Sequence, residues 1–185
     1  MRRQRTDGWS GLLALPLFGL TAWGLLRFGG SAGPFLALAV ALVGAGRLYG
    51  PLLRLRRLRA LKLSDVDGMA GHEFEAYVAL LLKRRGFAVE LTGASGDLGV
   101  DLIAERADQR IAVQAKRHSR PVSRRAVSDA VAAAGHYRCN AAMVVTNSYF
   151  TEGACALAGS TGCDQVDREQ LSEWIAAFRA GRTHR

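Results

Sequence analysis

The chain is 185 residues long, which allows one ordinary domain and a smaller segment. Its formal net charge is +9, but residues 1–62 hold ten Lys and Arg and one acid, whereas residues 63–185 hold fifteen of each sign. The excess positive charge therefore belongs to the N-terminal segment, and it does not indicate what the remaining residues, whose net charge is zero, bind. The three cysteines form no Cys-x-x-Cys pair, which argues against a zinc site or a disulfide framework and favours free thiols in a reducing compartment.

Two apolar runs without a charged residue open the chain. They cover residues 8–26 and 28–46, each nineteen residues long, and only Arg27 separates them. A helix needs about 20 predominantly apolar residues to cross a membrane. The runs therefore predict a transmembrane hairpin in residues 1–53, with spans at about 8–26 and 33–53.

Basic residues flank this hairpin and set its orientation. Three arginines precede the first span, and a basic juxtamembrane linker at 54–66 follows the second. The positive-inside rule places both ends in the cytoplasm, as in a multi-pass protein of the bacterial inner membrane. Three roles are open for the basic linker: it sets the membrane topology alone, it binds anionic lipid, or it holds DNA against the membrane. Two alternatives to the hairpin stay open, which are a cleaved signal peptide and a buried hairpin of a soluble protein.

The pattern of residues 67–180 is that of one α/β domain, and a short tail follows at 181–185. The predicted order of elements suits a mixed sheet with helices on both faces. The elements are a helix at 70–85, strands at 87–92, 98–104 and 111–115, a helix at 124–137, a strand at 141–146, a helix after Thr151, a short strand at 165–166 and a closing helix from Asp167.

Apolar spacing of three and four residues predicts which side chains the helices bury. The side chains expected inside are Phe74, Val78, Leu81, Leu82, Val127, Val131, Cys155, Leu171, Trp174, Ile175 and Phe178. Tyr77 falls on a wetter side of the first helix. Ser123 and Thr151 are expected to cap the helices that follow them.

The strands at 98–104 and 111–115 are joined by the polar stretch Glu-Arg-Ala-Asp-Gln, which predicts a hairpin. Residues two apart on a strand share a face, so Gln114 and Lys116 point the same way. If the strands pair antiparallel, Asp101 comes near both of them. Carboxylate and amide oxygens suit a hard cation such as Mg²⁺, and a neighbouring ammonium suits a phosphate or an activated water.

Four stretches taken together resemble the catalytic domain of Mrr-type restriction endonucleases, within the PD-(D/E)xK nuclease superfamily. They are GHEFEAYVALLLKRRGF (71–87), SGDLGVDLIA (95–104), VQAKR (113–117) and VVTNSYFTEGACALA (144–158). Asp101 and Gln114-x-Lys116 match the Gln-x-Lys variant of the nuclease core. This chain has Val100 where the superfamily usually has a proline, and Gln114 replaces the usual acid, as is typical of the Mrr branch.

The resemblance implies a restriction-endonuclease-like fold and a Mg²⁺-dependent DNA endonuclease of the restriction or DNA-defence type. The hairpin expected at the N-terminus would anchor this nuclease to the membrane. The resemblance implies that Asp101, Gln114 and Glu75 hold the metal ion, Glu75 being the acid of a Gly-x-x-x-Glu pattern, and that Lys116 acts in catalysis beside them. It also implies products with a 5′-phosphate and a 3′-hydroxyl. The alternative for Glu75 is an ordinary solvated acid on a helix.

The stretch KRHSRPVSRR at 116–125 holds five Lys and Arg and no acid, which favours contact with DNA phosphates over an ordinary solvated loop. The residues expected to bind DNA are Arg117, Arg120, Ser123, Arg124 and Arg125, and the accessory site residues are Ser95 and Asp97. Two further functions stay open, namely a repair or Holliday-junction-type nuclease and a non-catalytic, membrane-tethered DNA-binding module. The sequence also leaves a homodimer open.

Overall fold

The computed structural model describes Trp23, residues 33–92 and residues 99–181. The chain divides into two compact units, residues 1–57 and residues 58–185. The first expected span, at 8–26, and the accessory residues Ser95 and Asp97 lie outside the described residues, apart from Trp23.

The described part of the N-terminal unit is dominated by one long helix, α2 (Gly33–Ala60), which continues to the start of the second unit. Its segment Pro34–Ala60 has a mean hydropathy of 1.7 over its most apolar window, of which only 12% is buried. Large apolar side chains such as Phe35 and Leu42 are exposed. Among the described residues α2 alone is long and apolar enough, by length and composition, to cross a membrane, and the first span of the expected hairpin lies outside them. The basic stretch expected to be a linker is helical as far as Ala60.

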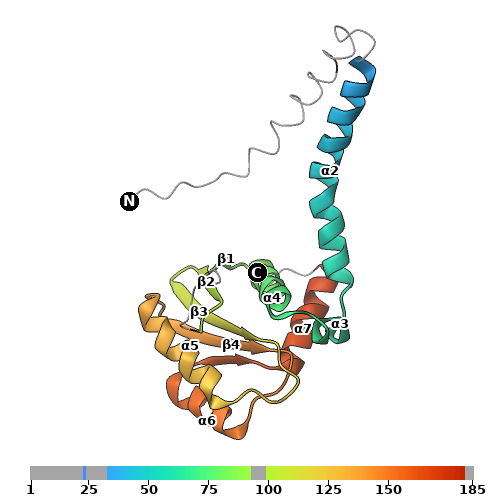
Figure 1. Ribbon diagram of the computed structural model, residues 1–185. Coiled ribbons are helices and arrows are strands. Elements are labelled where there is room, and N and C mark those ends of the chain that lie inside the picture. Colours follow the sequence, from blue (N-terminus) through green and yellow to red (C-terminus); the bar gives the residue numbers. More distant parts are fainter. Residues whose placement is uncertain (1–22, 24–32, 93–98, 182–185) are drawn as a thin grey trace. The chain divides into compact units, whose positions relative to one another are not determined.

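The second unit is a mixed α/β domain around a five-stranded sheet (Figure 1). The strands lie in the order β1-β2-β3-β4-β5, with β1, β2 and β3 antiparallel and β3, β4 and β5 parallel. The strands are β1 (Ala88–Leu91), β2 (Leu102–Arg106), β3 (Gln109–Lys116), β4 (Ala141–Thr146) and β5 (Asp164–Val166). The helices are α3 (Leu63–Asp67), α4 (Gly71–Arg84), α5 (Arg124–His136), α6 (Glu152–Thr161) and α7 (Arg168–Arg179).

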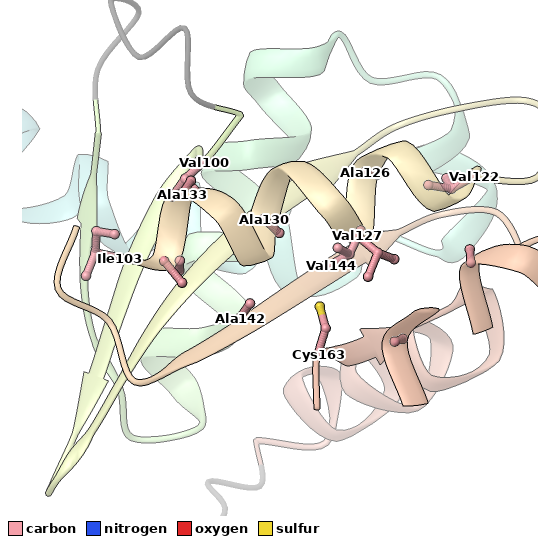
Figure 2. Packing of buried hydrophobic residues seen from close by; sticks show 14 residues of the cluster. Val100, Ile103, Val122, Ala126, Val127, Ala130, Ala133, Ala142, Val144 and Cys163 are labelled. Atoms are coloured by element: carbon pink, nitrogen blue, oxygen red, sulfur yellow. The ribbon is translucent and has the colours of Figure 1, made fainter. Parts of the chain in front are cut away.

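Helices cover both faces of this sheet, as the alternation of buried residues requires. Helices α5 and α6 pack on one face, and α4 and α7 contact each other over the other (Figure 1). On the α5 face, Val127 of the helix packs near Val144 of β4 (Figure 2), and Ala112 of β3 belongs to the same buried cluster. The neighbouring strand residues, such as Val113, are equally buried but point to the α4 face. Strand β3 is therefore the centre of the core, covered on both sides.

The predicted helices and strands are found in the predicted order, with a few side chains differently placed. Tyr77, expected on a wet side of α4, is 2% exposed because its ring packs edge-on against Phe178. Cys155, expected inside α6, is exposed, since Ala154 is the residue that faces the core. Ser123 occupies the position before α5 but its side chain makes no capping hydrogen bond.

The hairpin between β2 and β3 is tighter than the sequence predicts. The expected five-residue polar turn is reduced to Ala107 and Asp108, and the strands run on through Arg106 and from Gln109. Ala107 has a φ of 52°, a left-handed conformation that an alanine rarely adopts. Glu105 and Arg110 lie opposite each other on the two strands and form an ion pair, which stabilises this end of the hairpin.

Candidate active site

Asp101 stands at the point where β2 begins, and it is fixed to β3 through both its backbone and its side chain. Its amide N–H donates to the Val113 carbonyl at 3.0 Å, and its Oδ2 accepts the Ala115 N–H at 2.8 Å. The Asp101 carbonyl accepts the Thr92 N–H of the strand end on its other side at 3.1 Å. The carboxylate therefore has a defined position, with one oxygen committed to β3.

Glu75 and Lys116 lie within electrostatic reach of Asp101. Burial raises the pKa of Asp101, while the Ala115 N–H and then the Lys116 ammonium act to lower it. Burial also raises the pKa of Glu75, the charge of Asp101 raises it further, and His72 and Lys116 oppose these effects. Two half-buried carboxylates that repel each other, with an ammonium beside both, form a site that a cation would stabilise.

Gln114 reaches this region from the α5 side of β3, and it is 1% exposed. The regular pairing ends at Leu102 and Val113, and the Asp101 N–H also bonds the Val113 carbonyl, so Asp101 lies beside Val113 and one residue out of step with Gln114. Among the described residues no hydrogen bond joins the two side chains, and the buried Oε1 of Gln114 has no partner. An amide oxygen left unpaired in a protein interior is costly, so the unsatisfied Oε1 of Gln114 invites a partner.

The donor set fits a hard cation such as Mg²⁺, which prefers oxygen ligands and retains several waters. The residues available to hold it are Asp101, Glu75 and Gln114, with one oxygen of Asp101 not used by β3. No group of three or more His, Cys, Asp or Glu side chains suited to a metal occurs in the part of the chain that is described. Within the described residues, Gln114 is the third oxygen donor of the expected ligand set beside Asp101 and Glu75.

The end of β3 that carries Lys116 is held by a buried polar side chain to which the sequence analysis assigned no role in the site. Asn147, which follows β4, is 4% exposed, and its Oδ1 accepts the His118 N–H at 2.8 Å while its Nδ2 donates to Asp67 Oδ1 at 2.8 Å. Arg168 donates to both carboxylate oxygens of Asp67, each at 2.8 Å, and to the Asn147 carbonyl at 2.7 Å. We call Asn147, Asp67 and Arg168 the asparagine clamp.

The asparagine clamp acts on the segment that carries Lys116. Thr146 adds a bond from its hydroxyl to the Lys116 carbonyl at 2.7 Å, so the backbone on both sides of Arg117 is tied to the end of β4. The Arg168 hydrogen bonds lower the pKa of Asp67 and keep it ionised. Asp67 and Arg168 are 101 residues apart, so no local pattern links them, although Thr146 and Asn147 lie within the stretch that carries the family resemblance.

The basic stretch after β3 is exposed along most of its length. Arg117 donates to the Asp67 carbonyl at 3.1 Å and is partly committed to the fold. Arg120, Arg124 and Arg125 are exposed, and Arg125 makes a long contact of 3.9 Å with Asp129. Ser123 is exposed as well. The predicted DNA-contacting side chains thus lie on the surface that follows Lys116 in the chain, with Arg117 the least free of them.

A protein-family comparison matches residues 66–175 to Mrr_cat, described as a restriction endonuclease. Among solved structures, the DNA modification-dependent restriction endonuclease AspBHI has 18% sequence identity and a TM-score of 0.50, over 70% of this chain and 35% of that one. The MspJI restriction endonuclease in complex with a 27-mer oligonucleotide has 19% identity and a TM-score of 0.45, over 60% of this chain and 28% of that one.

A protein of unknown function, AF1548, has 24% identity and a TM-score of 0.44, over 50% of this chain and 55% of that one. This chain thus spans little more than half of the length of AF1548 and about a third of the two enzymes. None of the curated proteins matches it. The likeness to AspBHI supports the mixed sheet flanked by helices that the structure shows.

Proposed function

The chain belongs to the Mrr_cat family of restriction endonucleases, and from that premise we propose that its C-terminal domain cleaves DNA with Mg²⁺ at the site formed by Asp101, Glu75, Gln114 and Lys116. Membership makes this a domain of the DNA endonuclease type. The observation that supports the finer proposal is the hydrogen bond of the Asp101 carboxylate to the Ala115 N–H, 2.8 Å long and next to Lys116, whose charge lowers the pKa of both Asp101 and Glu75.

Each side chain of the site has a distinct task in this proposal. Asp101, Glu75 and the Oε1 of Gln114 hold the metal ion. The chemistry that Mg²⁺ supplies when bound is polarisation of the scissile phosphate and a lower pKa for a coordinated water. Lys116 orients the attacking water or stabilises the extra negative charge on the phosphorus centre. The interactions that hold Asp101 against Ala115 and His118 against Asn147 keep these groups in register with one another.

The exposed arginines that follow β3 are proposed to contact the DNA backbone. Arg120, Arg124 and Arg125 are exposed, which leaves them free to meet phosphates. Such contacts supply affinity that is independent of sequence. Replacing Arg124 and Arg125 together by Ala should reduce the slope of log affinity against log salt by about 2. An unchanged slope would show that these arginines belong to an ordinary solvated loop and do not contact DNA.

We propose that the N-terminal segment anchors the nuclease domain to a membrane by α2 and by the apolar run at 8–26, with the domain in the cytoplasm. The supporting features are the exposed apolar side chains of α2 and the arginines at its C-terminal end, including Arg54, Arg56 and Arg57. Retention of the full chain in the membrane fraction after alkaline carbonate extraction supports the anchor. Release of the chain into the soluble fraction contradicts it.

The direct test of the proposed activity uses the full chain purified in detergent and supercoiled plasmid DNA. With Mg²⁺ we expect nicked and then linear plasmid, and with a chelator we expect none. A folded protein that binds DNA but does not cut it with any divalent cation would favour the non-catalytic DNA-binding module. Preference for branched DNA over methylated and unmethylated duplexes would favour the repair or junction nuclease, which shares the same site.

A further inference from the structure

A glycine marks the place where Gln114 meets helix α5. Gly99, in the approach to β2, has a left-handed φ of 74°, and a Cβ placed on it would lie 3.0 Å from Gln114 Nε2 and 3.0 Å from Asp129 Cβ. Three elements therefore come close together at this point, and a side chain on Gly99 would be tightly packed and strained by the positive φ. The amide nitrogen of Gln114 and the Cβ of Asp129 lie within about 6 Å of each other, since both are 3.0 Å from one point.

The two ends of the Gln114 amide thus face different surroundings. Its Nε2, a donor of two hydrogens, is directed to the side where Asp129 and Gly99 lie. Its Oε1 is buried and has no partner among the described residues. The carboxylate of Asp129 accepts hydrogen bonds and donates none, and its side chain is 43% exposed. No hydrogen bond joins Gln114 and Asp129 in the described part of the chain, but this orientation of the amide places its donor on the side of the acceptor and leaves Oε1 as the free end.

We propose that Asp129 is a positioning residue for the metal site, which fixes the orientation of Gln114 so that its Oε1 is presented to the cation. This inference rests on the proposed function, because it takes Gln114 as a ligand. It also accounts for the neutral ligand at position 114. A glutamate at this position would have no amide hydrogens and would place a second carboxylate beside Asp129. The two like charges would repel each other and move the ligand oxygen away from the metal position.

The test is a double-mutant cycle with Gln114→Glu and Asp129→Asn in the full chain. Mg²⁺ itself is titrated by calorimetry in the absence of DNA, so that the readout is affinity and not cleavage. We expect Asp129→Asn alone to weaken Mg²⁺ binding by about 10–100-fold, the usual cost of losing a residue that orients a ligand. Gln114→Glu alone should bind Mg²⁺ no more tightly than the natural chain, although it adds a negative charge.

The double variant distinguishes orientation from simple charge counting. Asp129→Asn supplies amide donors to the new carboxylate and removes the repulsion, so we expect it to tighten Mg²⁺ binding by about 10-fold or more in the Gln114→Glu background. The same substitution thus weakens binding in one background and strengthens it in the other. Asp108→Asn is the matched control, since it removes one exposed carboxylate at the opposite end of the β2–β3 hairpin and should leave Mg²⁺ affinity unchanged.

The outcomes separate this inference from the proposed function. If Asp129→Asn changes Mg²⁺ affinity by the same factor in both backgrounds, Asp129 does not orient Gln114 and the inference is wrong, while a natural chain that binds Mg²⁺ and cuts DNA leaves the proposed function intact. If the natural chain binds no Mg²⁺ and cuts no DNA, the proposed function itself is wrong. Thermal unfolding of each folded variant shows that its affinity is that of the native domain.

Discussion

Replacement of Asn147 by Ala tests whether the asparagine clamp positions the catalytic end of β3. Asn147 is buried, and alanine removes its bonds to the His118 N–H and to Asp67 Oδ1, both 2.8 Å long. Its carbonyl, which accepts from Arg168, is retained. The substitution therefore frees the backbone that follows Lys116 and leaves the Asp67–Arg168 pair in place.

The cost to stability follows from the partners left behind. A hydrogen bond contributes about 0.5–1.5 kcal/mol net, and a buried donor left without a partner costs about 1–3 kcal/mol. Asp67 keeps both of its bonds to Arg168, and His118 is exposed, so water can reach the His118 N–H that loses its partner. The loss of two hydrogen bonds should therefore lower the free energy of unfolding by about 1–3 kcal/mol. A shift of about 1 Å in the position of Lys116 should lower cleavage by about 10²-fold.

Asn140 is the matched control for this substitution. Its Oδ1 accepts the Arg110 N–H at 2.9 Å and its Nδ2 donates to the Asp108 carbonyl at 2.8 Å, so it also makes two side-chain hydrogen bonds. It is exposed and lies at the other end of β3 and β4. Asn140→Ala should cost less stability and leave cleavage unchanged.

Thermal unfolding and single-turnover cleavage of the folded protein, both on the full chain in detergent, separate the two effects. We expect Asn147→Ala to lower the rate of cleavage while the Kd for DNA stays the same. If both variants cut as fast as the natural chain once folded, or both lose the same fraction of the rate, the asparagine clamp stabilises the domain without positioning Lys116.

Two further predictions concern the charged groups of the site. Lys116→Ala should lower the rate of single-turnover cleavage by about 10²–10³-fold. Mg²⁺ affinity, measured by calorimetry, should stay nearly unchanged, because an ammonium cannot ligate a cation. Normal cleavage by this variant would contradict the catalytic role of Lys116. The pKa values of Asp101 and Glu75 are raised, chiefly by burial, so protons compete with Mg²⁺ over a pH range above that of ordinary carboxyl groups. Mg²⁺ affinity should therefore fall as pH falls through this range. The metal-free domain should instead lose stability as pH rises through it, because the fold disfavours the charged forms of both carboxyl groups. The opposite trend in either measurement would refute the assignment.

The fold was largely predictable because most of its elements have clear local patterns. The apolar spacing of α4 predicts the burial of Phe74, Val78, Leu81 and Leu82, and all four are buried. Strand β4 is found over the predicted residues 141–146. Tyr77 was misplaced because its burial depends on Phe178 of α7, about a hundred residues later, and not on the period of its own helix.

The approach of Asp101 to Lys116 was predictable from the sequence, but the contacts that support these residues were not, and their roles in the site stay predictions. Asp101 and Lys116 come together because antiparallel pairing of two adjacent strands is a local event. The asparagine clamp joins Asp67, Asn147 and Arg168, which come from three distant parts of the chain. Asp129 approaches Gln114 only after α5 has packed on the sheet. Such contacts depend on tertiary packing, which residue spacing does not report.

The central claim is that the carboxylate of Asp101 holds the cation that DNA cleavage requires. The most direct measurement is Mg²⁺ binding together with plasmid cleavage for Asp101→Asn in the full chain, with Asp108→Asn as the control carboxylate. Asparagine keeps an oxygen that can accept the Ala115 N–H, so the fold should survive. We predict loss of both Mg²⁺ binding and cleavage in Asp101→Asn and neither in Asp108→Asn. A folded Asp101→Asn variant that binds Mg²⁺ and cuts DNA as the natural chain does would contradict the account.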